Sequence, residues 1–131
     1  MEFTSAELYD LINRPGPLWL VMADLSHANL GGVNLDRANL FRANLGGAEL
    51  GKASLKGANL RWANLGGANL DGANLDGANL NDARLSEAIL YEASLVDADL
   101  SGANLKDAKF NKNTKWPAGF DPGLAGAKII R

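Results

Sequence analysis

Three residues near the start of the chain are of the types that hydrolases use for nucleophilic catalysis. Asp24, Ser26 and His27 stand close together, and His27 is the only histidine among the 131 residues. A catalytic Ser–His–Asp relay needs these side chains arranged around the imidazole, with further donors for the oxyanion. Neighbours along one extended segment do not build that arrangement, so we expect no catalytic residue and no enzymatic activity. Because the chain has no cysteine, cysteine catalysis and disulfides are excluded. We also expect no metal and no cofactor.

A second group of residues suggests binding rather than catalysis. Phe41 and Arg42 stand side by side, and Arg61 and Trp62 form a similar pair twenty residues later. Aromatic rings beside guanidinium groups favour cation–π contacts, and both residue types are typical anchors of protein interfaces. These four residues form our candidate interaction surface, provided that the chain brings positions twenty residues apart together.

A five-residue repeat meets this condition. Leu occupies every fifth position from 25 to 105, and Phe110 takes the next place; the residue two before is Ala throughout, except for Val33. On a helix successive Leu would be rotated by about 140°, and on a strand they would alternate between faces. A chain that turns a corner every five residues instead keeps all of them inside. Four corners close a square, so the chain returns above itself after twenty residues.

The other positions of the repeat agree with stacked square coils. Gly often stands at the second position after the Leu, where a corner needs positive φ. Asn stands before the Leu ten times, which permits ladders of side chains between coils. The stacked turn pairs form four edges of the solenoid. One edge holds Val21-Met22, Phe41-Arg42, Arg61-Trp62, Asn81-Asp82 and Ser101-Gly102. We expect Trp62 to be exposed on this edge, with Arg42 stacked over its ring.

The A(N/D)LXX pattern of residues 23–112 resembles the pentapeptide-repeat family, in particular its short bacterial members of cyanobacterial type. The resemblance covers about two-thirds of the chain. It implies an all-β solenoid, a right-handed quadrilateral β-helix of about 4.5 to 5 coils.

The two ends of the chain depart from the repeat and are expected to cap the solenoid. In residues 1–17, Thr4 and Glu7 fit a helix capping box and Pro15 follows the predicted helix. The β-helix itself is predicted for residues 18–112, beginning with a degenerate first repeat, Leu18–Met22, that contacts the cap. Residues 113–131 are predicted to form an irregular or short helical cap, with Trp116 and Phe120 covering the last coil.

Charge is distributed unevenly along the predicted solenoid. Residues 36–61 carry five basic and two acidic groups, a net +3, whereas residues 71–107 carry two basic and eight acidic groups, a net −6. The net charge of the whole chain is −2, which disfavours direct nucleic-acid binding. The chain holds no apolar run of membrane-spanning length and no signal pattern at its start, so we expect a cytoplasmic location without membrane contact.

These observations lead to one function and one alternative. The sequence favours a non-enzymatic, rigid scaffold that binds an unknown protein partner and is itself a monomer or a weak homodimer. The family resemblance also implies an alternative, a DNA-mimicking modulator of a type II topoisomerase such as gyrase. The basic half of the chain argues against mimicry, because duplex DNA is negative along its whole length.

Overall fold

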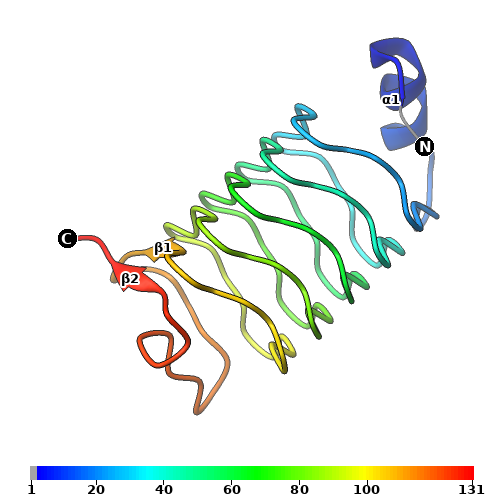
Figure 1. The fold of residues 1–131 in the computed structure, drawn as a ribbon. Coiled ribbons are helices and arrows are strands. Elements are labelled where there is room, and N and C mark those ends of the chain that lie inside the picture. Colours follow the sequence, from blue (N-terminus) through cyan, green and yellow to red (C-terminus); the bar gives the residue numbers. More distant parts are fainter. Residues whose placement is uncertain (1–2) are drawn as a thin grey trace.

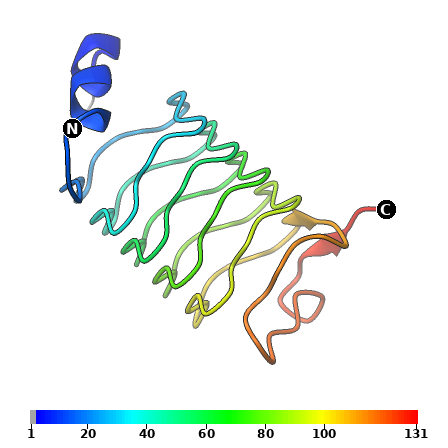
Figure 2. The same ribbon diagram turned by 180° about the vertical axis from the view of Figure 1, so that it is seen from behind.

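Parallel backbone pairing at intervals of twenty residues builds the computed structural model, which describes residues 3–131 (Figures 1 and 2). Coils 1 to 5 begin at residues 18, 38, 58, 78 and 98. Each side of a coil pairs with the same side of the next coil, so four rows of bridges run along the stack. One of these, the Trp19 row, consists of Trp19, Asn39, Asn59, Asn79 and Asp99. The predicted square coil with a twenty-residue period is confirmed.

The repeated Leu and Ala side chains fill the interior of the stack. Every repeated Leu from Leu30 to Leu95 is at most 1% exposed. The Ala residues between them are buried as well, while Val33 and Phe110 are only partly buried. One Leu and one Ala from each side of a coil are therefore enough to fill the narrow core.

Tight turns form the corners. The N–H of the Ala, or of Val33 in its place, donates to the carbonyl of the Leu three residues earlier, as from Ala63 to Leu60 at 3.0 Å. The second turn residue has positive φ, which Gly47 adopts at 64° as expected. Among residues 3–131, eleven residues other than Gly adopt it too, including Trp62 at 62°. Stacking therefore imposes the left-handed conformation even where the side chain disfavours it.

The Asn residues of the repeat satisfy backbone groups of the turns. Their Oδ1 atoms accept from the backbone N–H two residues later, as in Asn59 with Arg61 at 3.1 Å. The predicted ladder is present as well, because Asn64 donates through Nδ2 to Asn44 Oδ1 at 3.2 Å. Each such Asn thus fixes its own turn, and some of them also link neighbouring coils.

Two positions of the repeat hold Ser in place of Asn and use a residue of the previous coil. Ser54 donates through Oγ to the Asp36 carboxylate, and the same carboxylate oxygen accepts from the Lys56 N–H at 3.1 Å. The same arrangement recurs forty residues later, two coils further along the stack, where Asp76 accepts from the Ser94 hydroxyl and from the Val96 N–H. A short Ser and an Asp eighteen residues earlier thus do together what one Asn does elsewhere.

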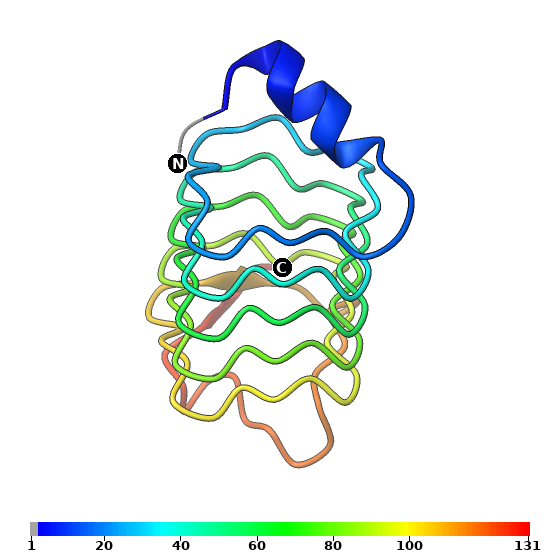
Figure 3. The same cartoon turned by 90° about the vertical axis from the view of Figure 1, so that its right-hand side faces the viewer.

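Helix α1, Ser5–Ile12, lies across the open end of coil 1 (Figure 3). The expected capping box is present, since the Glu7 N–H donates to Thr4 Oγ1 at 3.1 Å and the Thr4 N–H donates to Glu7 Oε1 at 3.0 Å. Phe3, Leu8, Leu11 and Ile12 pack partly buried against the core. Within residues 3–131 there is no helix with the length and apolarity needed to cross a membrane.

The solenoid stacking continues beyond residue 112. Strand β1, Lys109–Phe110, pairs in parallel with strand β2, Lys128–Ile129, so the C-terminal segment begins a sixth level. One extra residue enters before this level, because Ser94 pairs with Lys115. The segment expected to be irregular or helical has turns and a strand, and residues 113–131 contain no helix. Trp116 stacks on Phe120 with ring centroids 5.3 Å apart and closes this end.

Candidate interaction surface

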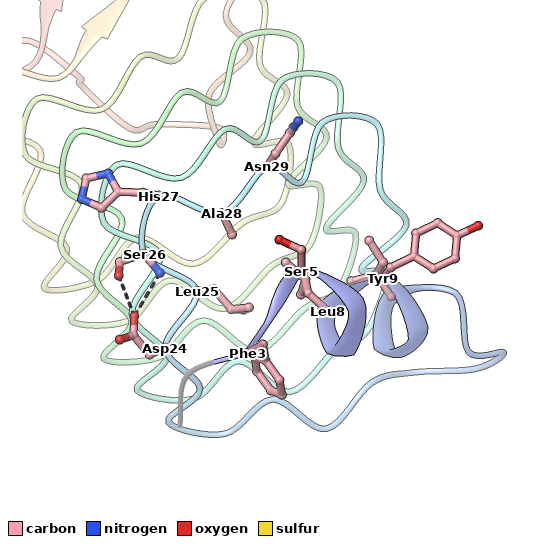
Figure 4. Close-up of a pocket in the computed structure, with 11 residues that line it drawn as sticks. Phe3, Ser5, Leu8, Tyr9, Asp24, Leu25, Ser26, His27, Ala28 and Asn29 are labelled. Carbon is pink, nitrogen blue, oxygen red and sulfur yellow. Dashed lines mark hydrogen bonds between the residues drawn. The ribbon is translucent and has the colours of Figure 1, made fainter.

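The residues of the hydrolase type do not form a relay. Asp24 Oδ1 accepts from the Ser26 hydroxyl at 2.6 Å and from the Ser26 N–H at 3.1 Å (Figure 4). The hydrogen bond from the Ser26 side chain is the main cause that lowers the pKa of Asp24. The His27 ring lies over the next coil, where a Cβ at Gly47 would come within 2.5 Å of it. The carboxylate is bound by the serine rather than the imidazole, so the three residues serve as a turn.

A groove of about 400 Å³ separates these residues from helix α1. Phe3, Leu8 and Leu25 contribute its apolar wall, whereas the ring of Tyr9 points away from the coils (Figure 4). Across the described residues, 3–131, no three carboxylate or imidazole groups gather in the way a metal site requires. The groove is best explained as the seam between the helix and coil 1.

The four candidate residues share one edge of the solenoid, in coils 2 and 3. The Arg42 N–H donates to the Arg61 carbonyl at 3.0 Å, which fixes the two turn pairs directly against each other. Trp62 is 49% exposed, and Phe41 is half-buried. The structure therefore brings together the residues that the twenty-residue spacing selected, and the expectation of an exposed Trp62 is confirmed.

The expected stacking partner of Arg42 is wrong. Its guanidinium lies 5.5 Å from the centroid of the Phe41 ring, rather than over Trp62. Phe41 and Arg42 belong to the same turn, whereas Trp62 lies one coil further along the axis. The shorter reach within one turn decides the contact, and the Trp62 ring keeps half its surface in solvent.

The apolar surface extends further than the sequence analysis predicted. Leu18 and Leu20 are buried as the register requires, but Trp19 is 76% exposed and Met22 is 62% exposed. The signal was present in the sequence, because a residue between two inward-facing Leu on an extended side must point outward. We name the edge of stacked turn pairs from Val21-Met22 to Ser101-Gly102 the aromatic edge; the Trp19 row lies beside it.

Charge along the aromatic edge and the Trp19 row changes sign between coils 3 and 4. Arg42 and Arg61 belong to coils 2 and 3, whereas Asp82 and Asp99 belong to coils 4 and 5. Hydrogen bonds from Ser101, above all from its side chain, lower the pKa of Asp99 and keep it ionised. The surface is therefore positive and aromatic toward the helix and negative toward the other end.

The repeated segment of the chain matches a known family of proteins. The family model described as pentapeptide repeats (8 copies) matches residues 20–57, 53–90 and 78–112, which is more than half of the chain. A comparison with curated protein sequences finds no match.

Several solved structures are similar to the chain. A pentapeptide repeat protein from Nostoc PCC 7120 is 34% identical, with 99% of this chain and 98% of that one covered and a TM-score of 0.44. One from the thylakoid lumen of Arabidopsis thaliana is 32% identical over 68% of this chain and 66% of that one, with a TM-score of 0.56. Rfr23 from Cyanothece 51142 is 36% identical over 79% and 67%, with a TM-score of 0.46. Because the family model matches more than half of the chain, the chain belongs to the pentapeptide repeat family.

Proposed function

We propose that the protein is a non-enzymatic scaffold that binds another protein through the aromatic edge. The observation that carries this proposal is Trp62, a large ring 49% exposed on a rigid corner with an arginine directly before it. Aromatic and arginine side chains dominate the energy of protein interfaces, most of all where they sit on a pre-organised surface. Stacked coils supply that surface without the loss of loop entropy that a flexible site would incur.

The remaining edges carry smaller or more hydrophilic residues at the corresponding level. In coil 3, the other three turn pairs are Gly66-Gly67, Asp71-Gly72 and Asp76-Gly77. The core does not need an aromatic residue at position 62, since the same turn place accepts Gly and charged residues elsewhere in the stack. Its presence is therefore better explained by a contact outside the chain.

The test compares variants in capture experiments from the source cell. Trp62→Ala should abolish capture of the partner while leaving the free energy of unfolding within about 1 kcal/mol of wild type, because the ring is outside the core. Lys52→Ala is the matched control, because Lys52 occupies the same turn place at φ 59° on another edge. A partner that binds Trp62→Ala as well as wild type would overturn the assignment of this surface.

The family resemblance also suggests the DNA-mimicking modulator of gyrase. Its support is weaker, because the coils on the helix side carry the basic half of the charge. A gyrase supercoiling assay with and without the protein separates this function from scaffolding.

A further inference from the structure

We propose that the partner of the aromatic edge is a second copy of this chain, packed side by side and antiparallel through the aromatic edge and the Trp19 row. This inference rests on the proposed function and names the occupant of the same surface. It follows from two features of the surface, its charges and its apolar groups, that are both arranged about the same two-fold axis.

The charges are ordered as a two-fold interface requires. Along the axis the surface presents Arg42, Arg61, Asp82 and Asp99, one in each of coils 2 to 5. A two-fold axis perpendicular to the stack, between coils 3 and 4, brings coil 3 opposite coil 4 of the second copy. It also brings coil 2 opposite coil 5. Arg61 then faces Asp82, and this pair occurs twice. Arg42 lies opposite Ser101-Gly102, next to Asp99 of the Trp19 row.

The apolar groups obey the same symmetry. Trp19, 76% exposed, projects from coil 1. At the other end of the same row, a groove of about 450 Å³ opens between coil 5 and the segment after it. Leu100, Pro117 and Phe120 line this groove. The two-fold axis between coils 3 and 4 places coil 1 of one copy opposite the level that follows coil 5 in the other copy. The Trp19 ring of each copy therefore meets the groove of the other.

Trp62 lies beside the centre of this interface. In coil 3 it is next to the axis, so the two Trp62 rings of the pair come within about one coil spacing, ~4.8 Å, along the stack. Buried aromatic residues near the centre are where interface energy concentrates. The parallel alternative would place Arg on Arg and Asp on Asp, which like-charge repulsion disfavours.

The size of the surface sets the expected affinity. Five coils at ~4.8 Å give a contact about 24 Å long, so the interface belongs to the small, weak class. We expect reversible dimerisation at concentrations on the order of 10–100 μM. High salt should weaken it, because dissolved ions screen the attraction between the paired charges.

Two single charge reversals test the geometry by sedimentation velocity of the full chain. Arg61→Asp places Asp where Asp71 and Asp76 already occupy the same turn position, and Asp82→Arg places Arg where Arg37 and Arg42 do. Each variant alone sets like charges opposite each other twice, so each should dimerise at least about 10-fold more weakly than wild type. An equimolar mixture restores two opposite-charge pairs, and the heterodimer should form with nearly the wild-type affinity.

Two variants with charge changes on other edges of the solenoid serve as controls. Lys52→Asp and Glu87→Arg make the same charge changes on other edges and should leave dimerisation unchanged. A wild-type chain that stays monomeric up to about 1 mM at low salt would overturn the dimer, as would a mixture that fails to associate. If capture of another protein still depended on Trp62 in that case, the scaffold proposal would stand while the second copy would be wrong as its partner.

Discussion

Ser54 shows how one residue of a repeat depends on another coil. An Asn at this place would accept from the N–H two residues later with its own side chain. The shorter Ser does not reach, and the Asp36 carboxylate of the previous coil accepts from the Lys56 N–H instead. Because Ser54 donates to that same carboxylate, the two side chains act as one unit.

A double-mutant cycle should reveal this coupling. Asp36→Ala is expected to cost about 1 kcal/mol or more of unfolding free energy, since it leaves two donors without their acceptor. In the Ser54→Asn background the same change should cost little, because the Asn side chain supplies the acceptor. Urea denaturation measures both values, and we expect a coupling energy above about 0.5 kcal/mol.

Asp71→Ala is the matched control for this cycle. Asp71 occupies the same turn place on another edge, where Ile89 rather than Ser stands eighteen residues later. Combined with Ser54→Asn, it should give strictly additive changes in unfolding free energy. Additive changes for Asp36 as well would show that the carboxylate and the serine act independently.

At the scale of elements, helix α1 and the solenoid depend on each other. Eight residues are too few for a stable isolated helix, and the capping box adds only about 1 kcal/mol. Its half-buried apolar side chains need the first coil, and in return they cover the otherwise open end of the core. An uncovered end would expose Leu side chains and unpaired strand edges, which template association between chains.

Deletion of residues 1–14 should therefore convert the protein into higher oligomers or aggregates, as measured by light scattering. The association should grow with concentration, and it should persist in Arg61→Asp, since the open end rather than the aromatic edge causes it. A truncated chain that remained monomeric with wild-type stability would show that α1 is not a cap.

At the scale of the whole molecule, most of the architecture could be predicted from the repeat. The interior is specified redundantly, since each side restates the same Ala and Leu; Val33 and Phe110 change little. The twenty-residue register also places Arg42 and Trp62 on one edge, because this assignment depends only on the number of residues between them.

Features that depend on local choices could not be predicted. Whether Arg42 covers Phe41 or Trp62 is decided by side-chain reach, which the repeat does not encode. The sixth level breaks the twenty-residue period, because Ser94 pairs with Lys115 twenty-one residues later and Lys109 pairs with Lys128 nineteen residues later. Only Ala127 and Ile129 keep the spacing of the Ala and Leu positions there.

Stability of the whole stack should fall in acid. The pKa values of Asp24 and Asp99 are lowered, chiefly by hydrogen bonds from the side chains of Ser26 and Ser101. A carboxylate with a lowered pKa stabilises the folded state above its unfolded pKa, near 3.9, and loses this contribution as the pH falls through the folded value. The unfolding free energy should decrease below about pH 4. Urea denaturation at pH values from about 2 to about 6, roughly one pH unit apart, measures this decrease.

The variant Asp24→Asn with Asp99→Asn separates these two groups from the other carboxylates. Asn keeps the acceptor for the backbone N–H, as Asn59 does, but does not titrate. Its unfolding free energy should depend less steeply on pH below 4 than that of wild type. Asp71→Asn removes one charge at a turn position and is the comparison; equal slopes in all three proteins would contradict the assignment.

The interior of this protein repeats every five residues, but each edge of its exterior repeats only every twenty. Gain or loss of a single five-residue unit would keep every Leu and Ala inside, yet it would rotate all later turn pairs by a quarter turn relative to the earlier ones. Asp82 would leave the edge that carries Arg61, and an Asp–Ser pair that spans the change would be separated. The core therefore tolerates the gain or loss of any number of five-residue units. The surface residues return to their original edges only after four units have been added or removed.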